Sequence, residues 1–109
     1  FYAENNRFRL QVWPKNADGS QAAPERTIWS TTLQRGVWYR ITLHARWSGS
    51  DTSGFVELFV NGKPAGSKTY IRTLAPGSPN YFKMGYYRNS GFSQTGVVYI
   101  DDFRATQVN

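Results

Sequence analysis

The sequence contains no cysteine, which excludes a disulfide framework and any metal site built on thiolates. It has no apolar run near the roughly 18 residues that a membrane-spanning helix needs. Sustained helical periodicity is also missing. Acidic residues are few, with 7 Asp and Glu against 13 Lys and Arg, so the net charge is +6. The cations are dispersed rather than gathered in a run, which favours an anionic partner held in a groove over a nucleic-acid-binding tail.

Alternating apolar and polar residues predict β-strands along the whole chain. The expected strands are 7–13, 27–33, 37–47, 55–60, a short edge piece around 68–71, 81–87 and 96–106. Glycine, proline and asparagine separate them. Asn61-Gly62 is the strongest hairpin signal, because both central residues of a type I′ turn need a positive φ. We therefore expect one all-β domain over residues 1–109, an antiparallel β-sandwich or jelly roll, or the C-terminal part of a larger one.

The two faces of the predicted strands differ in chemistry. One face is aliphatic, and we expect these residues to point to one side of their sheet: Phe8, Leu10, Ile41, Leu43, Val56, Leu58, Phe82 and Met84. The other face combines cations with aromatic rings and amides, including Arg9, Gln11, Arg40, His44 and Arg46. Arginine pairs with carboxylates through two parallel hydrogen bonds, and aromatic rings stack on sugars. These faces favour a carbohydrate groove, and a second packing layer of polar aromatic residues is the alternative.

The stretch NYFKMGYYRNSG, residues 80–91, raises the same question most sharply. In a strand, Tyr81, Lys83, Gly85 and Tyr87 would share one face. That face would carry the Lys83 ammonium, the Tyr81 and Tyr87 phenols, and no side chain at Gly85. Gly85 would let a sugar approach the backbone closely, although a β-bulge at this position is an equal alternative.

Residues 81–87, YFKMGYY, resemble the YFKxGxY signature of the jelly-roll polysaccharide lyases, which include alginate-lyase and heparin-lyase-like families. Over residues 37–106 the order of WYRITLHARW, VNGK, YFKMGYYRN and VVYIDDFRA resembles the C-terminal half of the heparin-lyase-like family. The resemblance implies a concanavalin-like jelly roll and β-elimination on an acidic, uronic-acid-containing polysaccharide such as alginate, glucuronan or a glycosaminoglycan. It implies no cofactor.

This resemblance assigns roles to individual residues. Tyr87 would transfer protons, and Lys83 of the same motif would be a second catalytic residue that serves a different part of the sugar chain. His44 would act as base or carboxylate partner, with a structural role as the alternative. The expected substrate-binding residues are Arg40, Arg46, Tyr81, Gly85, Arg9 and Gln11. Asp101 and Asp102 are adjacent, so they point to opposite faces of a strand and make neither an acid/base pair nor a metal site.

The sequence also departs from the family. Domains of this kind are longer, and residues 1–36 do not match their substrate-groove strand convincingly. The Gln-x-His pair of alginate lyases is missing, because Thr42 and Leu43 precede His44. We therefore expect that an N-terminal half of the same domain is a further partner.

Other functions remain open at this point. A non-catalytic carbohydrate-binding module of lectin or laminin-G type is the main alternative to a lyase. A structural interaction domain comes next, and nucleic-acid binding last. We expect a secreted, extracellular protein of a bacterium or a fungus. The first residues lack the layout of a signal peptide, so any export signal lies outside this chain.

Overall fold

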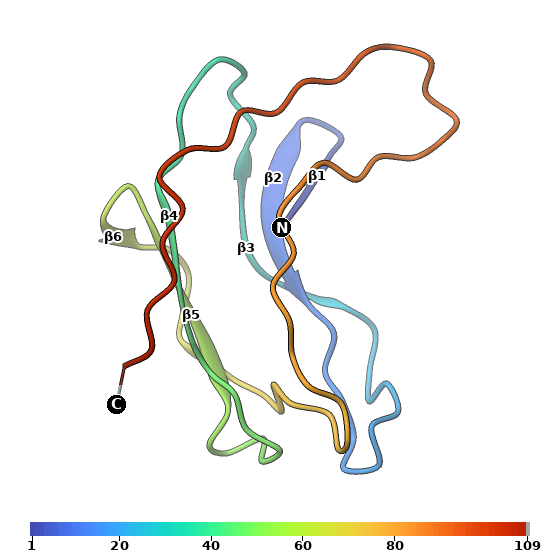
Figure 1. Ribbon diagram of the computed structural model, residues 1–109, viewed down its shortest axis with the longest axis vertical. Helices are drawn as coiled ribbons and strands as arrows, with labels where there is room; N and C mark the ends of the chain where they lie inside the picture. Colours follow the sequence, from blue (N-terminus) through green and yellow to red (C-terminus); the bar gives the residue numbers. More distant parts are fainter. Residues whose placement is uncertain (109) are drawn as a thin grey trace.

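The computed structural model describes residues 1–108 and shows two antiparallel β-sheets, with no helix in that range (Figure 1). The first sheet has the order β1-β2-β3 and the second the order β4-β5-β6, with β7 also pairing with β5. The strands are β1 (Tyr2–Glu4), β2 (Arg7–Val12), β3 (Arg26–Thr32), β4 (Ile41–Arg46), β5 (Phe55–Val60), β6 (Lys63–Pro64) and β7 (Thr69–Tyr70). The all-β prediction is confirmed, and the arrangement is consistent with part of a β-sandwich.

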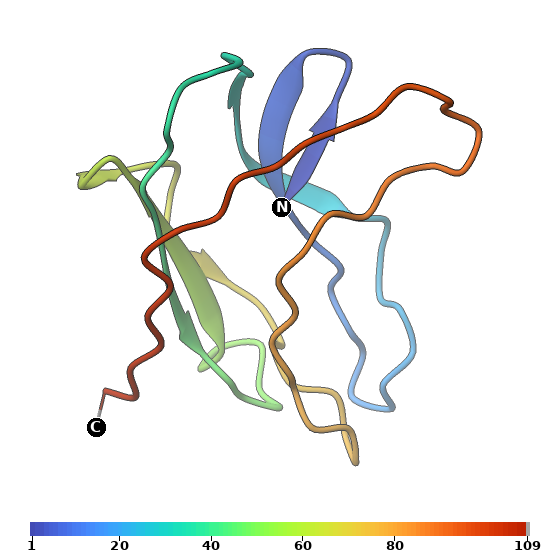
Figure 2. The same ribbon diagram turned by 45° about the horizontal axis from the view of Figure 1, so that its top comes forward.

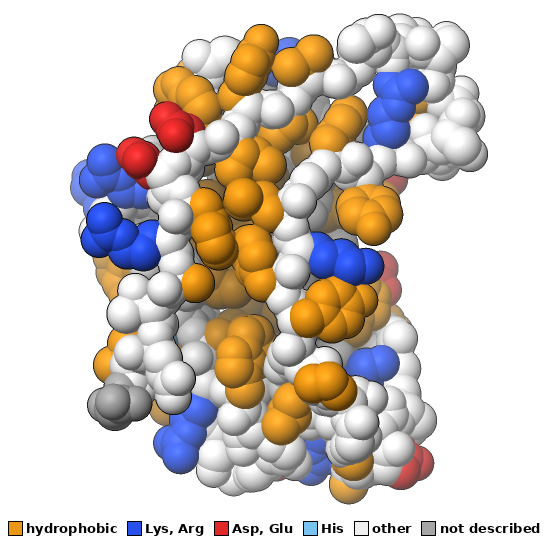
Figure 3. Space-filling view, viewed as in Figure 1, with side chains coloured by type: hydrophobic (Ala, Val, Ile, Leu, Met, Phe, Trp, Pro, Cys, Tyr) orange, Lys and Arg blue, Asp and Glu red, His pale blue; other side chains and the backbone are white. Residues whose placement is uncertain are grey.

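The two sheets meet through their apolar faces. On the first sheet Phe8 packs edge-on against Trp29, with ring centroids 5.5 Å apart. Tyr39, just before β4, reaches across to Phe8 at 5.4 Å. Hydrophobic side chains accordingly gather along the middle of the molecule in the space-filling view (Figure 3). The buried residues are Leu10, Phe55, Val56, Leu58 and Ile71, a small set from which we expect modest stability.

The register of β4 and β5 explains which side chains reach this core. Val56 lies opposite Ala45, and Leu58 lies opposite Leu43, so these pairs share one face. Leu58 is 2% exposed, as its alternation predicts. Leu43 points to the same side of the sheet as Leu58, as expected, but is 43% exposed.

The predicted hairpin turn is confirmed. Asn61 and Gly62 have φ values of 52° and 80° and join β5 to β6. Asn61 also closes the start of β4, because its backbone N–H donates to the Arg40 carbonyl at 2.8 Å. Its side-chain oxygen accepts from the Arg40 N–H at 3.0 Å. The expected edge piece around 68–71 is β7, Thr69–Tyr70.

The predictions of strands at 81–87 and 96–106 are wrong. Both segments run as irregular chain in Figures 1 and 2. A strand needs a neighbour for its backbone N–H and C=O groups, and residues 1–108 supply none to these segments. Asp102 also leaves the extended conformation, with φ 53°. Phe82 and Met84, expected on the aliphatic face of a strand, are consequently 67% and 50% exposed.

Candidate functional site

The 81–87 segment keeps part of the predicted arrangement without being a strand. The Lys83 ammonium lies 5.0 Å from the centroid of the Tyr81 ring, within the range of a cation–π contact. Phe82, between them in sequence, stacks instead on Phe103, with centroids 4.6 Å apart. The structure thus brings the Tyr81 ring and the Lys83 charge together on an open surface, where Tyr81 is 72% exposed.

Tyr87 lies at the base of the loop that follows the motif. Arg88 holds this loop by donating to the carbonyl oxygens of Phe92, at 2.8 Å, and Gln94. Tyr87 itself is 84% exposed. Within residues 1–108 its hydroxyl makes no hydrogen bond to another side chain, so the phenol is open to a ligand.

Gly85 stands between Lys83 and Tyr87 with free space around it. A Cβ built on Gly85 would meet nothing within 4 Å. Glycine is therefore not required here by crowding within the chain. The backbone at this point is accessible to a bound molecule.

His44 belongs to a different cluster, on the face of β4 and β5 opposite Val56 and Leu58. Its Nδ1 lies 3.1 Å from a Glu57 carboxylate oxygen, and its ring meets the edge of Phe55 at 5.0 Å. The Lys68 ammonium lies 3.7 Å from the centroid of the same Phe55 ring. Arg46 stands opposite Phe55 in the β4–β5 register. His44 contacts these neighbours and not the 81–87 segment, so its catalytic role stays a prediction.

Arg40 lies next to a hollow that sequence patterns did not single out. Trp38, Arg40 and Asn61 line this hollow, which has a volume of about 310 Å³. Trp38 is 65% exposed. Its ring offers a stacking surface beside the Arg40 guanidinium, a combination that suits a charged sugar. The signal in the sequence was the i, i+2 spacing of Trp38 and Arg40.

Arg9 is engaged within its own sheet. Its guanidinium pairs with the Glu4 carboxylate at 3.0 Å and lies 5.5 Å from the centroid of the Tyr2 ring. Gln11, two residues on, is half-buried next to a register shift in the β2–β3 ladder. Because Glu4 already neutralises Arg9, these two positions are weaker anchors for an acidic ligand than Lys83 or Arg40.

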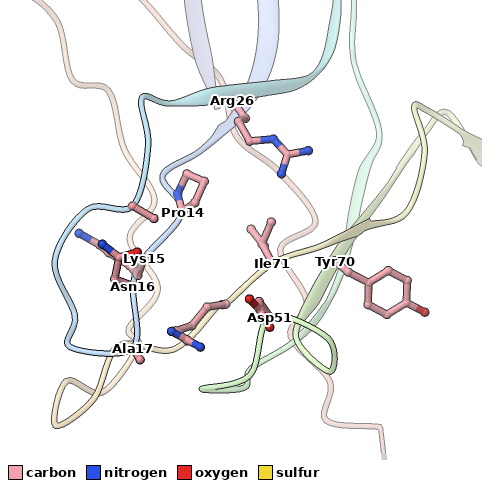
Figure 4. A pocket seen from close by; sticks show the side chains of 10 residues that line it. Pro14, Lys15, Asn16, Ala17, Arg26, Asp51, Tyr70 and Ile71 are labelled. Atoms are coloured by element: carbon pink, nitrogen blue, oxygen red, sulfur yellow. The ribbon is translucent and has the colours of Figure 1, made fainter.

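A pocket of about 290 Å³ lies where the loops at one end of the two sheets converge (Figure 4). None of the predicted site residues lines it. Its lining comes from four separate parts of the chain: Pro14, Lys15, Asn16, Ala17, Ala22, Arg26, Asp51, Tyr70, Ile71 and Arg72. No local motif joins such distant residues, which is why the sequence did not reveal the pocket.

Asp18 accepts two hydrogen bonds from Ser20. The Ser20 hydroxyl and backbone N–H donate to Asp18, and these hydrogen bonds lower the pKa of that carboxyl. Across residues 1–108 no three His, Cys, Asp or Glu side chains gather as metal ligands would. In the same part of the chain no helix has the length and apolar character needed to cross a membrane.

Comparison with known proteins gives one match. A family model described as polysaccharide lyase matches residues 1–104. No curated protein and no solved structure matches the chain.

Proposed function

Because the chain belongs to the polysaccharide lyase family, we propose that it acts on an acidic polysaccharide by β-elimination, with Tyr87 as the proton-transferring residue. The observation that carries this proposal is the exposure of the YFKMGYY motif and the charge beside its rings. Its final tyrosine is 84% exposed, with the Lys83 ammonium and the Tyr81 ring on the same stretch of chain.

The reaction makes three demands on the site. The uronate carboxylate has to be neutralised, because otherwise the C5–H bond is too weakly acidic. A base then takes the C5 proton, and the electrons of that bond form the C4=C5 double bond as the C4–O bond breaks. The departing oxygen finally receives a proton. A tyrosine can serve in proton transfer when nearby cations favour its phenolate, because its ordinary pKa is about 10.

Two cations of the chain are candidates for neutralising the uronate carboxylate. Lys83 lies on the motif itself, and Arg40 borders the hollow beside Trp38. A carboxylate of the bound polymer would meet Lys83, and the neighbouring Tyr81 ring would pack against the sugar. Gly85 leaves room for the ring to come close to the backbone.

A non-catalytic binding module is the second candidate. The observation in its favour is that, among residues 1–108, no basic side chain forms a hydrogen bond with the Tyr87 hydroxyl. The exposed rings of Trp38, Tyr81 and Tyr87 would then be a stacking platform for a glycan.

One experiment separates the two candidates. The protein is incubated with alginate, glucuronan and heparin, and the ultraviolet absorbance of the unsaturated uronide product is followed. Growth of that band with any of the three polymers supports the lyase. Binding without growth of the band contradicts the lyase and supports the module.

A further inference from the structure

The pocket at the end of the two sheets has the dimensions and lining of a small-molecule site. It is bounded by the loop after β2, the first residue of β3, the loop between β4 and β5, and the chain that leaves β7. Its volume of about 290 Å³ is at the lower end of the range of about 300–1,000 Å³ for ligand sites. This size suits a single sugar ring better than a stretch of polymer.

The pocket has an apolar floor and an apolar wall. Ile71 forms the floor and is 7% exposed. Pro14 and Ala17 add apolar wall, whereas the Tyr70 ring points away from Ile71 (Figure 4) and packs edge-on against Phe55, with ring centroids 5.9 Å apart. The floor and the wall are apolar surfaces against which the C–H face of a pyranose ring packs.

Charge of both signs faces the same space. Lys15, Arg26 and Arg72 line the pocket together with a single carboxylate, Asp51. Figure 4 shows the Arg26 guanidinium pointing toward Ile71, with Asp51 on the other side of Ile71. Throughout residues 1–108 the ion pairs within 4.0 Å are Arg9–Glu4 and His44–Glu57, so Asp51 is not neutralised by its neighbours.

One of the cations is fixed in place. The Arg72 Nε donates to the Gly49 carbonyl at 2.6 Å, which holds the guanidinium to the loop between β4 and β5. A guanidinium held through Nε retains its terminal N–H groups for a carboxylate. Arg26 lines the pocket and makes no side-chain hydrogen bond in the described part of the chain, so its N–H donors are not used by the protein itself.

We propose that this pocket, separate from residues 81–87, binds one uronic acid residue of the acidic polysaccharide. The Arg26 guanidinium takes the carboxylate, Ile71 and Pro14 pack on the ring, and Asp51, on the other side of Ile71, accepts hydrogen bonds from sugar hydroxyls. The inference rests on the substrate class in the proposed function. Asp51 sets the selectivity, because a carboxylate repels a bare inorganic anion and attracts a polyol.

The test follows backbone amide signals by NMR while a glucuronate tetrasaccharide is added at low salt. We expect the Ala17 and Ile71 amides to shift, with an affinity that falls roughly tenfold in Arg26→Gln, since a hydrogen bond between charged groups is removed. Asp51→Asn should also weaken binding of the tetrasaccharide. Arg35→Gln is the matched control, because Arg35 is exposed and does not line the pocket. It should bind like the wild type.

Several results would overturn the inference. They are shifts confined to residues 81–87, equal affinity in Arg26→Gln, and equal shifts of the pocket amides with sodium sulfate, which would mean a simple anion site. Asp51→Asn guards against misfolding of the arginine variant, because the Asp51 side chain makes no hydrogen bond within residues 1–108. Failure of the proposed function looks different. In that case no unsaturated product forms with any variant, while the pocket signals still respond to the tetrasaccharide.

Discussion

The ring of Phe82 stacks on the ring of Phe103, with centroids 4.6 Å apart and an angle of 22° between the ring planes. This contact joins the motif segment to the last part of the chain. The Tyr86 ring meets Gly96 on the same side of the loop, where a Cβ would collide with it. The two segments therefore run together as a loose hairpin that is held by side chains, without a β-ladder.

Replacing Phe103 with alanine should loosen this hairpin and leave the two sheets intact. The free energy of unfolding should fall by about 0.5–1.5 kcal/mol, because both rings are more than half exposed and the substitution mainly removes the stacking between them. Urea denaturation measures the change. Phe92→Ala is the control, because Phe92 is also exposed and has no stacking partner among the described residues. Equal effects of the two substitutions would contradict a role for the stack.

Tyr87→Phe tests proton transfer directly. The substitution removes the hydroxyl and keeps the ring, so turnover should fall by roughly 10²–10⁴-fold while polysaccharide binding stays nearly unchanged. The rate of unsaturated product formation is the measurement. Tyr99→Phe removes the same group from a tyrosine that is 78% exposed outside the motif, and should react like the wild type. Full activity of Tyr87→Phe would end the catalytic assignment.

Lys83→Ala should affect binding more than turnover. The ammonium is exposed to solvent beside the Tyr81 ring, so its removal should raise KM by up to roughly fivefold and change kcat less. Kinetics over a range of polymer concentrations give both constants. Lys63→Ala, in the short strand β6, removes an exposed charge elsewhere and serves as the control. A loss confined to kcat would speak for direct chemistry by Lys83 instead.

Leu43 and Leu58 lie opposite each other on β4 and β5, and we expect them to contribute different amounts to the free energy of unfolding. Leu58→Ala should lower the free energy of unfolding by about 2–5 kcal/mol, because Leu58 is 2% exposed. Leu43→Ala should cost roughly half of that or less, because its side chain is 43% exposed. Chemical denaturation of the two variants checks the order. A greater loss in Leu43→Ala would mean that the core lies elsewhere.

Binding of an acidic polymer should weaken as salt is added. The screening length falls from about 10 Å at 0.1 M to about 3 Å at 1 M ionic strength, and the candidate cations are dispersed over an open surface. Alginate affinity should therefore drop between these conditions, as measured by calorimetry. A neutral glucan serves as the control, and its binding should not change. Alginate affinity independent of salt would contradict charge-driven binding.

The sequence predicted those strands whose partners lie close by in the chain. Alternation located β2, β3, β4 and β5 to within a few residues, and Asn61-Gly62 indicated the turn. In each case the neighbouring strand is present in residues 1–108. Local pattern and tertiary pairing then agree.

The same pattern failed for 81–87 and 96–106. Alternation tells which side chains would share a face, but it does not supply the neighbouring strand that makes a ladder. The inter-sheet pocket was missed for a related reason. Arg26, Asp51 and Arg72 come from different segments, and only the docking of the two sheets brings them to one space.

Asn61 ties the hairpin turn to the candidate binding surface. Asn61 adopts the left-handed conformation of the turn. It also forms hydrogen bonds with both the N–H and the carbonyl group of the Arg40 backbone. The conformation of the turn and the backbone position of Arg40 therefore depend on each other. Anyone who redesigns this turn for stability also changes the ligand surface, and glycan affinity has to be assayed alongside the melting temperature.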